Sequence, residues 1–453
     1  MKINFIKLLY EEVNNMKNNK GITLVAVVVT IVVLLILAGV SINLILGNNG
    51  IIVKAREAQK KSAEASQNDL IGMNELTQQL EGVLNTNDGG NTGESGTDIK
   101  VPAEATAETA PYFPDNTFTK KEGTIDTGLV IQDASGNEYV WVVVPRTTAV
   151  YATTGLGKTT FTDADYTNIE TDLKNYTSIY RNGTNYSDTW HGDDKNEGWL
   201  SETEYKALKN KMLKSVYENG GFYVGRYEAG IIENRTGEPV TNSAGKYTIE
   251  GMPAPLSKAD AYPYTWVTRT QAQNLAQNVN SGTKASSLMF GIQWDLVVAF
   301  MSKDVTKITS IEILTKDSTT IGNYYNSTFD LDRGKYAKVG QLEKEWNSFE
   351  SEFRDIVVTN EITGKMKKAK QSSNENAILL TTGGTEQSKI KNIYDIAGNV
   401  WEWTIEYAQS IDIPCTFRAG SASDAGGYPP VAYRENRSTD NSYFNIGFRV
   451  SIF

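Results

Sequence analysis

The sequence predicts an α+β protein that combines one long apolar helix near its start with an irregular domain of short strands and few helices. The run from Ile22 to Leu46 contains 25 residues and no charge. Beyond about residue 124, short β-branched and aromatic runs are separated by turn residues and do not alternate regularly with helices. With 453 residues, of which 40% are hydrophobic, the chain is long enough for more than one domain and a sizeable core.

Composition excludes several classes of function. The net charge is −10 and no dense run of Lys or Arg occurs, so we expect no nucleic-acid partner. Cys415 is the single cysteine and His191 the single histidine. An intrachain disulfide, a CxxC zinc site and a site with two histidine ligands are therefore impossible within one chain. Because His191 lies in a polar stretch, we expect a surface loop there and not a catalytic base.

The apolar run near the start predicts a membrane-spanning helix. At 1.5 Å per residue it exceeds the hydrocarbon core of about 30 Å, and it is too long for the apolar part of a secretory signal peptide. The sequence before it, Lys17-Asn18-Asn19-Lys20-Gly21-Ile22, resembles the class III leader of type IV prepilins. This resemblance implies that a prepilin peptidase cleaves between Gly21 and Ile22 on the cytoplasmic side, which removes residues 1–21.

Charge around the span sets the expected orientation. Lys2, Lys7, Lys17 and Lys20 precede it, so the positive-inside rule keeps the N-terminus in the cytoplasm and places the C-terminal part outside the cell. The chain departs from the prepilin pattern at Ala26, where the family usually has a glutamate that helps subunits register in a fibre. That departure leaves anchoring intact and puts filament assembly in doubt. A plain signal anchor is the alternative.

The segment between membrane and domain is expected to form a stalk. The transmembrane and stalk helix should cover residues 22–84, and apolar side chains recur in its second half at spacings of three and four from Leu70 to Leu84. Such a stripe fits either a pilin helix that packs on other pilins or a short coiled coil. Residues 85–123 are rich in Asn, Gly, Thr and Pro, and we expect a flexible linker there.

The remaining residues, 124–453, are expected to form the folded domain. Hydrophobic patterning predicts strands at Tyr139–Val144, Phe222–Tyr227 and Ile446–Phe453, and helices at Lys206–Glu218, Thr270–Asn278 and Ile292–Met301.

Four short blocks in this domain resemble the formylglycine-generating-enzyme-like (sulfatase-modifying-factor) family. These blocks are Gly221–Glu228, Asn392–Thr404 with its Gly-Asn-Val-Trp-Glu-Trp core, Phe417–Ser421, and Asn445–Val450 with Gly-Phe-Arg-Val. The resemblance spans about 330 residues, although the strong matches are confined to the blocks. It implies a variant of the C-type lectin fold.

The resemblance also suggests a metal site and a buried ion pair. In the family the stretch around the Trp-Glu-Trp block supplies calcium ligands, so Asn399 and Glu402 are candidate calcium ligands here. Hydrogen bonding of these side chains to nearby backbone is the alternative. Trp401 and Trp403 are expected in or beside the core, and Arg449 is expected to pair with a carboxylate, with Glu402 as one candidate.

The catalytic residues of that family have no counterpart in this sequence. Its oxidases use two cysteines after the Arg-Gly-Gly-Ser-like block to bind copper, and its iron-dependent relatives need several histidines. Here the stretch Ser421–Tyr428 contains no cysteine, and Cys415 precedes the block. We therefore expect a non-catalytic domain without copper.

The segment between Arg418 and Arg449 is the candidate ligand-binding region. It is rich in Tyr, Asn, Ser and Asp, which give rigid contact area and adaptable hydrogen bonds in the binding loops of antibodies. The candidate ligand-binding residues are Tyr428, Tyr433, Asn436, Ser438, Asp440, Asn441, Tyr443 and Asn445. The segment also resembles the mutagenised patch of variable proteins from diversity-generating retroelements. An ordinary solvated loop is the alternative.

Together these patterns predict a single-pass membrane protein, anchored alone or in a pilus, that displays a non-catalytic domain for an unknown surface ligand, protein or glycan. It would act as a receptor or adhesin that a retroelement could diversify. Two alternatives remain open: an extracytoplasmic oxidase of the formylglycine-generating type, and a purely structural minor pilin or pseudopilin.

Overall fold

A computed structural model describes residues 102, 104–181, 183–184, 187–237, 239–341, 345–349, 357–359 and 364–453. These residues belong to one compact unit, 96–453. The predicted leader, transmembrane helix, stalk and cleavage site lie outside the described residues. Among the described helices, none is both long and apolar enough to cross a membrane.

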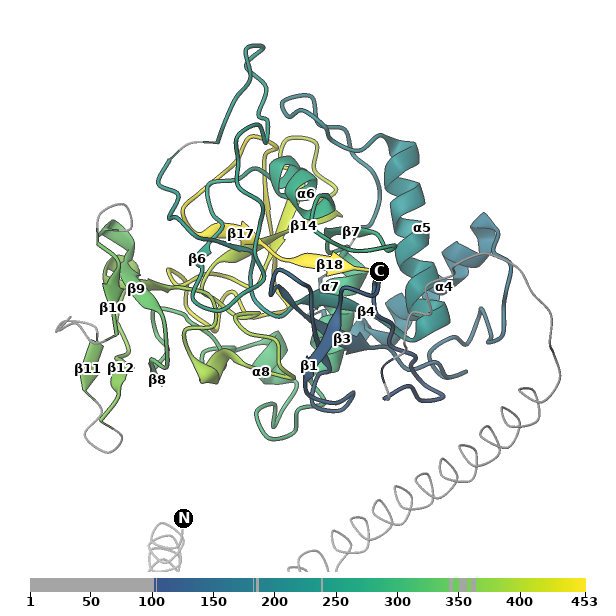
Figure 1. Cartoon of the computed structure of the whole chain (residues 1–453), viewed down its shortest axis with the longest axis horizontal. Coiled ribbons are helices and arrows are strands. Elements are labelled where there is room, and N and C mark those ends of the chain that lie inside the picture. The colour runs from purple at the N-terminus through teal and green to yellow at the C-terminus, as the bar shows by residue number, and fades with distance from the viewer. Residues whose placement is uncertain are drawn as a thin grey trace, which may run out of the picture. The chain divides into compact units, whose positions relative to one another are not determined.

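A six-stranded antiparallel sheet organises the unit, and the end of the chain lies inside it (Figure 1). The strand order is β1-β2-β3-β4-β18-β7. Its strands are β1 (Thr119–Glu122), β2 (Val130–Gln132), β3 (Glu138–Val143), β4 (Gly221–Gly225), β7 (Ser286–Leu288) and β18 (Val450–Ile452). Because β18 pairs with both β4 and β7, the last residues hold the two halves of this sheet together.

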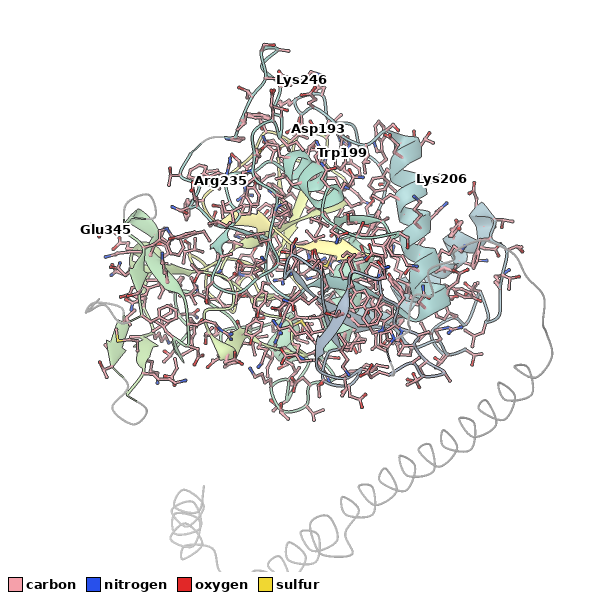
Figure 2. All side chains as sticks on the ribbon, in the orientation of Figure 1. Asp193, Trp199, Lys206, Arg235, Lys246 and Glu345 are labelled. Atoms are coloured by element: carbon pink, nitrogen blue, oxygen red, sulfur yellow. The ribbon has the colours of Figure 1, made fainter. Side chains whose placement is uncertain are left out.

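Helices cover this sheet and share its core. They are α4 (Asp163–Tyr176), α5 (Glu202–Asn219), α6 (Arg269–Gln277), α7 (Gly291–Met301) and the short α8 (Glu312–Thr315), with a 3-10 turn η2 at Ser178–Tyr180. A capping box between Ser201 and Glu204 begins α5, and Gly220 ends it with φ of 65°, a left-handed conformation that suits glycine. On the surface of α5, Lys206 reaches Asp163 of α4 at 2.8 Å (Figure 2).

A second, four-stranded sheet carries the Trp-Glu-Trp block. Its order is β16-β15-β14-β17, and β14 is parallel to β17. The strands are β14 (Trp401–Tyr407), β15 (Cys415–Arg418), β16 (Arg434–Arg437) and β17 (Ile446–Phe448). As predicted, Trp401 and Trp403 are buried, and both pack their rings edge-on against Phe417 of β15.

The described residues between 329 and 380 form a separate layer of small sheets, which we call the side lobe (Figure 1). It has a small hydrophobic core of its own that includes Phe329, Tyr336 and Ile378. Its elements are β8 (Phe329–Asp330), β9 (Lys335–Lys338), η3 (Val339–Gln341), β10 (Asn347–Ser348), β11 (Val357–Thr359), β12 (Met366–Lys368), η4 (Asn374–Asn376) and β13 (Ile378–Leu380). Outside the lobe, β5 (Gly230–Ile231) pairs with β6 (Tyr262–Pro263), and η5 covers Glu386–Ser388.

The predicted α+β class is confirmed, whereas the C-type-lectin-like fold stays a prediction. All three predicted helices are present, each with bounds shifted by one to four residues. The single strand predicted at Ile446–Phe453 is wrong, because β17 and β18 belong to different sheets and are separated at Arg449. Part of the expected linker also belongs to the folded unit: Thr109 and Tyr112 are buried, and β1 pairs with β2.

Candidate functional site

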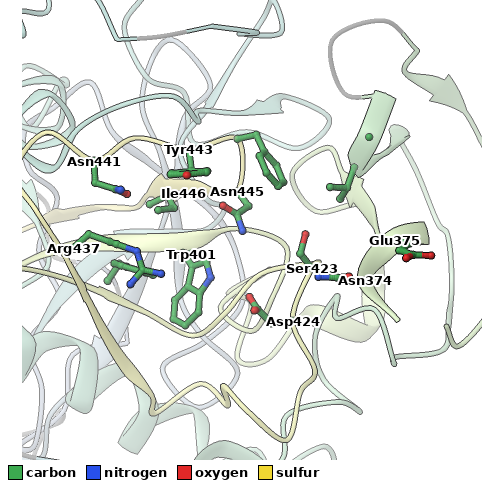
Figure 3. A pocket seen from close by; sticks show the side chains of 14 residues that line it. Asn374, Glu375, Trp401, Ser423, Asp424, Arg437, Asn441, Tyr443, Asn445 and Ile446 are labelled. Atoms are coloured by element: carbon green, nitrogen blue, oxygen red, sulfur yellow. The ribbon is translucent and has the colours of Figure 1, made fainter. Parts of the chain in front are cut away.

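A pocket of about 670 Å³ lies between the C-terminal segment and the side lobe (Figure 3). Its lining comes from four parts of the chain: the side lobe, β14 and β15, the turn after Gly420, and the segment from Arg437 to Ile446. The lining residues are Val339, Gly340, Asn374, Glu375, Trp401, Phe417, Ser423, Asp424, Arg437, Asn441, Tyr443, Phe444, Asn445 and Ile446.

Three of the eight candidate ligand-binding residues line this pocket: Asn441, Tyr443 and Asn445. Tyr443 is 51% exposed, so its side chain is accessible to a ligand in the pocket. Asn445 is held in place, since its Nδ2 donates to Ser421 Oγ at 3.1 Å and its carbonyl accepts from the Trp401 amide at 2.8 Å. The pocket therefore combines one rigid amide with one exposed aromatic ring, which also lies edge-on to Phe444.

The other five candidates do not line this pocket. The Tyr428 and Tyr433 hydroxyls contact each other, and Tyr428 is 67% exposed. Asn436 lines a different pocket of about 160 Å³ beside Arg434. Ser438 Oγ donates to Asp440 Oδ1 at 2.5 Å. Asp440 also forms an ion pair with Lys195, which holds the pKa of its carboxyl below the usual range.

Several lining residues were missed by the sequence analysis. Trp401 had been expected in or beside the core and Phe417 had been named only as part of a sequence block, and both also form the apolar floor of the pocket. Asn374 and Glu375 of η4 precede Asn441, Tyr443 and Asn445 by more than sixty residues in the sequence. They lie in a short turn without hydrophobic periodicity. No local pattern marks them, because their place in the site depends on how the side lobe packs.

The pocket contains polar groups whose hydrogen-bonding capacity is not used within the described residues. Ser423 Oγ and Asn441 Oδ1 are buried and have no hydrogen-bond partner among them. A buried polar atom without a partner costs roughly 1–3 kcal/mol, which a ligand or water can recover. Burial also raises the pKa of the Asp424 carboxyl. Two hydrogen bonds oppose this shift, one from the Ser421 amide at 2.9 Å and one from the Ser421 hydroxyl at 2.7 Å.

A buried ionic network fixes the strand that leads into the pocket. Arg434 of β16 donates to both carboxylate oxygens of Asp295 at 2.7 and 2.9 Å and to Glu406 Oε1 at 2.5 Å. Arg418 of β15 donates to the same two carboxylates at 3.1 and 3.4 Å, and Arg181 donates to Asp295 at 2.8 Å. Because Asp295 is in α7 and Glu406 in β14, the network binds β16 to a helix and to another strand of its own sheet.

The two candidate calcium ligands have their oxygens directed at donors. Asn399 Oδ1 accepts from Asn323 Nδ2 at 2.9 Å and from the Leu380 amide at 3.0 Å. Glu402 accepts three hydrogen bonds of 2.6–3.1 Å from Arg449, which confirms the expected partner of that arginine. A guanidinium at this distance repels a cation, so these side chains as arranged do not fit a calcium ion. Among the described residues, no group of three or more acidic, His or Cys side chains is placed to hold a metal.

Cys415 and His191 occupy structural positions. Cys415 is fully buried in β15, and burial raises the pKa of its thiol to about 11. His191 stacks on Tyr407 with ring centroids 4.7 Å apart, and its Nδ1 lies 2.8 Å from the Gly192 carbonyl.

Comparison with known proteins gives only distant likenesses. No protein-family model matches the sequence, and no curated protein matches it. Among solved structures, PvdO from Pseudomonas aeruginosa matches at 13% identity and a TM-score of 0.27, over 74% of this chain and 99% of that one. Treponema denticola variable protein 1 matches at 15% identity and a TM-score of 0.15, over 52% of this chain and 96% of that one. Scores this low carry no argument about fold or function.

Proposed function

We propose that this protein is a non-catalytic receptor or adhesin that displays its folded domain outside a prokaryotic cell. The observation that carries the proposal is the pocket beside the C-terminal segment. It brings together Asn441, Tyr443 and Asn445, with an exposed aromatic ring and buried polar atoms that have no partner in the part of the chain that the structure describes. Concave sites with an apolar floor and a few convergent polar groups are the usual form of ligand sites.

The N-terminal segment supports surface display. The apolar run from Ile22 to Leu46 is long enough to anchor the chain, and the lysines before it favour a cytoplasmic N-terminus. Under this proposal a prepilin peptidase cleaves after Gly21, and the domain stays attached to the membrane or to a pilus. A retroelement that diversifies the codons of residues 428–445 would alter the pocket wall formed by Asn441, Tyr443 and Asn445.

The environment of the Cys415 thiol does not favour the cysteine-dependent oxidation that the formylglycine-generating enzymes carry out. Cys415 is fully buried at the start of β15, and its raised pKa keeps it protonated near neutral pH. A substrate thiol could not reach it without the sheet opening.

Ligand binding can be tested with the folded domain on two probe sets, an array of bacterial and animal-cell glycans and a phage-displayed peptide library. We expect specific binding to at least one set, and a loss of at least tenfold in affinity for Tyr443→Ala. Tyr428→Ala is the matched control, because Tyr428 is also an exposed tyrosine but does not line the pocket. Binding that both variants retain would locate the site elsewhere, and no binding to either set would contradict the proposal.

A further inference from the structure

The charges in the pocket differ between its two ends. Figure 3 places Arg437 at one end and Glu375 at the other, with Trp401 and Asp424 between them. The Arg437 side chain is 46% exposed, and its guanidinium lies 5.2 Å from the centre of the Phe417 ring. Its nearest acidic partner is Glu435 at 3.5 Å, a loose exposed pair that a ligand carboxylate can replace at small cost.

Two carboxylates from different parts of the fold line the rest of the pocket: Glu375 lies at the end opposite Arg437, and Asp424 lies between the two ends. Glu375 is exposed on η4 of the side lobe, and Asp424 is in the turn that follows Gly420. No described ion pair involves either of them. Glu375 therefore makes the end formed by the side lobe negative, and Arg437 makes the end formed by β16 positive.

Side-chain amides are spread along the pocket between these charges. Asn374, Asn441 and Asn445 each carry one carbonyl and one NH₂ group, the same kinds of acceptor and donor as a peptide bond. Asn441 Oδ1 has no hydrogen-bond partner among the described residues. Tyr443, Phe444 and Ile446 add apolar surface against which a side chain can pack.

We propose, on the basis of the ligand-binding function above, that the ligand is a protein segment with a basic side chain directed at Glu375 and Asp424 and an acidic side chain directed at Arg437. A neutral glycan would leave these charges unpaired, and an acidic glycan would be repelled at the end formed by the side lobe. Charge complementarity of this kind mainly sets specificity and association rate. The side lobe is then a specificity element, because it supplies the acidic end.

The test is a selection of phage-displayed heptapeptides, flanked by Gly and Ser so that no free terminus adds charge. On the wild-type domain, enriched sequences should pair Lys or Arg with Asp or Glu. On Glu375→Gln the preference for basic residues should fall, and on Arg437→Gln the preference for acidic residues should fall. Glu250→Gln, an exposed glutamate outside the pocket lining, is the control with the same charge change and should select the wild-type sequences.

A synthetic peptide from the wild-type selection then gives the affinity. We expect each pocket variant to weaken its binding three- to tenfold and to reduce the salt dependence, with unchanged thermal unfolding because both side chains are exposed. Enriched peptides without charge preference, or variants that bind as the wild type does, would overturn the inference. Glycan binding that is lost in Tyr443→Ala, with no peptide enriched, would overturn it while leaving the proposed receptor function intact.

Discussion

At the scale of single residues, Arg449 joins the two main sheets. It lies between β17 and β18, is fully buried, and donates to Glu402 of β14 and to the carbonyls of Gly225 and Tyr394 at 2.9 Å. Burial raises the pKa of Glu402, and Arg449 opposes that shift. The pair thus keeps two charges inside the protein that neither side chain could keep alone.

Removal of Arg449 should therefore be costly. We expect Arg449→Met to lower the free energy of unfolding by about 3–5 kcal/mol, because Glu402 loses its counter-charge inside the core. Urea denaturation measures the loss. The double variant Arg449→Met/Glu402→Gln should recover part of the stability, and a double variant as unstable as the single one would show that the lost hydrogen bonds to Gly225 and Tyr394 dominate.

Lys368 should give the protein a measurable pH dependence. Its ammonium is buried and donates to the carbonyls of Tyr324, Tyr325 and Ser327 at 2.6–3.1 Å, and burial lowers its pKa to about 7. Between that value and the ordinary lysine pKa, the unfolded chain binds a proton that the folded chain does not. This group therefore makes stability rise with pH, by about 2 kcal/mol between pH 7 and pH 9.

The comparison with Lys368→Met isolates this contribution. The variant should be less stable than the wild type, since three buried carbonyls lose their donor, and the gap should widen as pH rises from 7 to 9. Asp188, whose pKa burial raises to about 8, gives the opposite dependence in both proteins and cancels in the difference. Urea denaturation at both pH values tests this, and a constant gap would contradict it.

At the scale of elements, the sequence predicted those helices and strands whose residues follow a regular local hydrophobic pattern. The helix at Lys206–Glu218 was predicted from hydrophobic patterning. It begins four residues earlier, at Glu202, after a capping box at Ser201 whose residues are visible in the sequence. The helix α4 was missed because its apolar residues are few and leave only a weak periodic pattern. The terminal strand was predicted as one piece because the residues around Arg449 are mostly apolar. Only the buried ion pair of Arg449 with Glu402 shows why the chain changes sheets there.

The strand β16 gives a prediction that links stability to binding. Arg434→Met should leave Asp295 and Glu406 with one fewer counter-charge in the core and lower the free energy of unfolding by about 3–5 kcal/mol. Peptide or glycan binding should weaken as well, because Arg437 and the segment that carries Asn441 follow directly in the chain. Arg437→Gln on the same strand is exposed and should change stability by about 0.5 kcal/mol or less. Equal stability of the two variants in urea would contradict the role of the network.

At the scale of the whole molecule, the candidate site illustrates the limit of local sequence patterns. The Tyr- and Asn-rich composition correctly directed attention to the C-terminal segment, yet only Asn441, Tyr443 and Asn445 of the eight candidates line the pocket. Tyr428, which precedes β16, contacts the Tyr433 hydroxyl, and Asn436 of β16 lines a different pocket beside Arg434. Glu375 joins the site through tertiary packing of the side lobe, so composition along the chain could not have marked it.

The anchoring proposal makes a prediction about the full chain in its native cell. Ile22–Leu46 should hold the protein in the membrane fraction through alkaline washing, because moving so many apolar side chains into water is strongly unfavourable. Mass spectrometry of the mature protein should find Ile22 at the N-terminus, and Gly21→Val should retain residues 1–21. Protease added to intact cells should digest the domain. A chain found in the soluble fraction, or a domain that is protected until the cells are lysed, would contradict surface display, and cleavage at another site would leave a plain signal anchor as the better description.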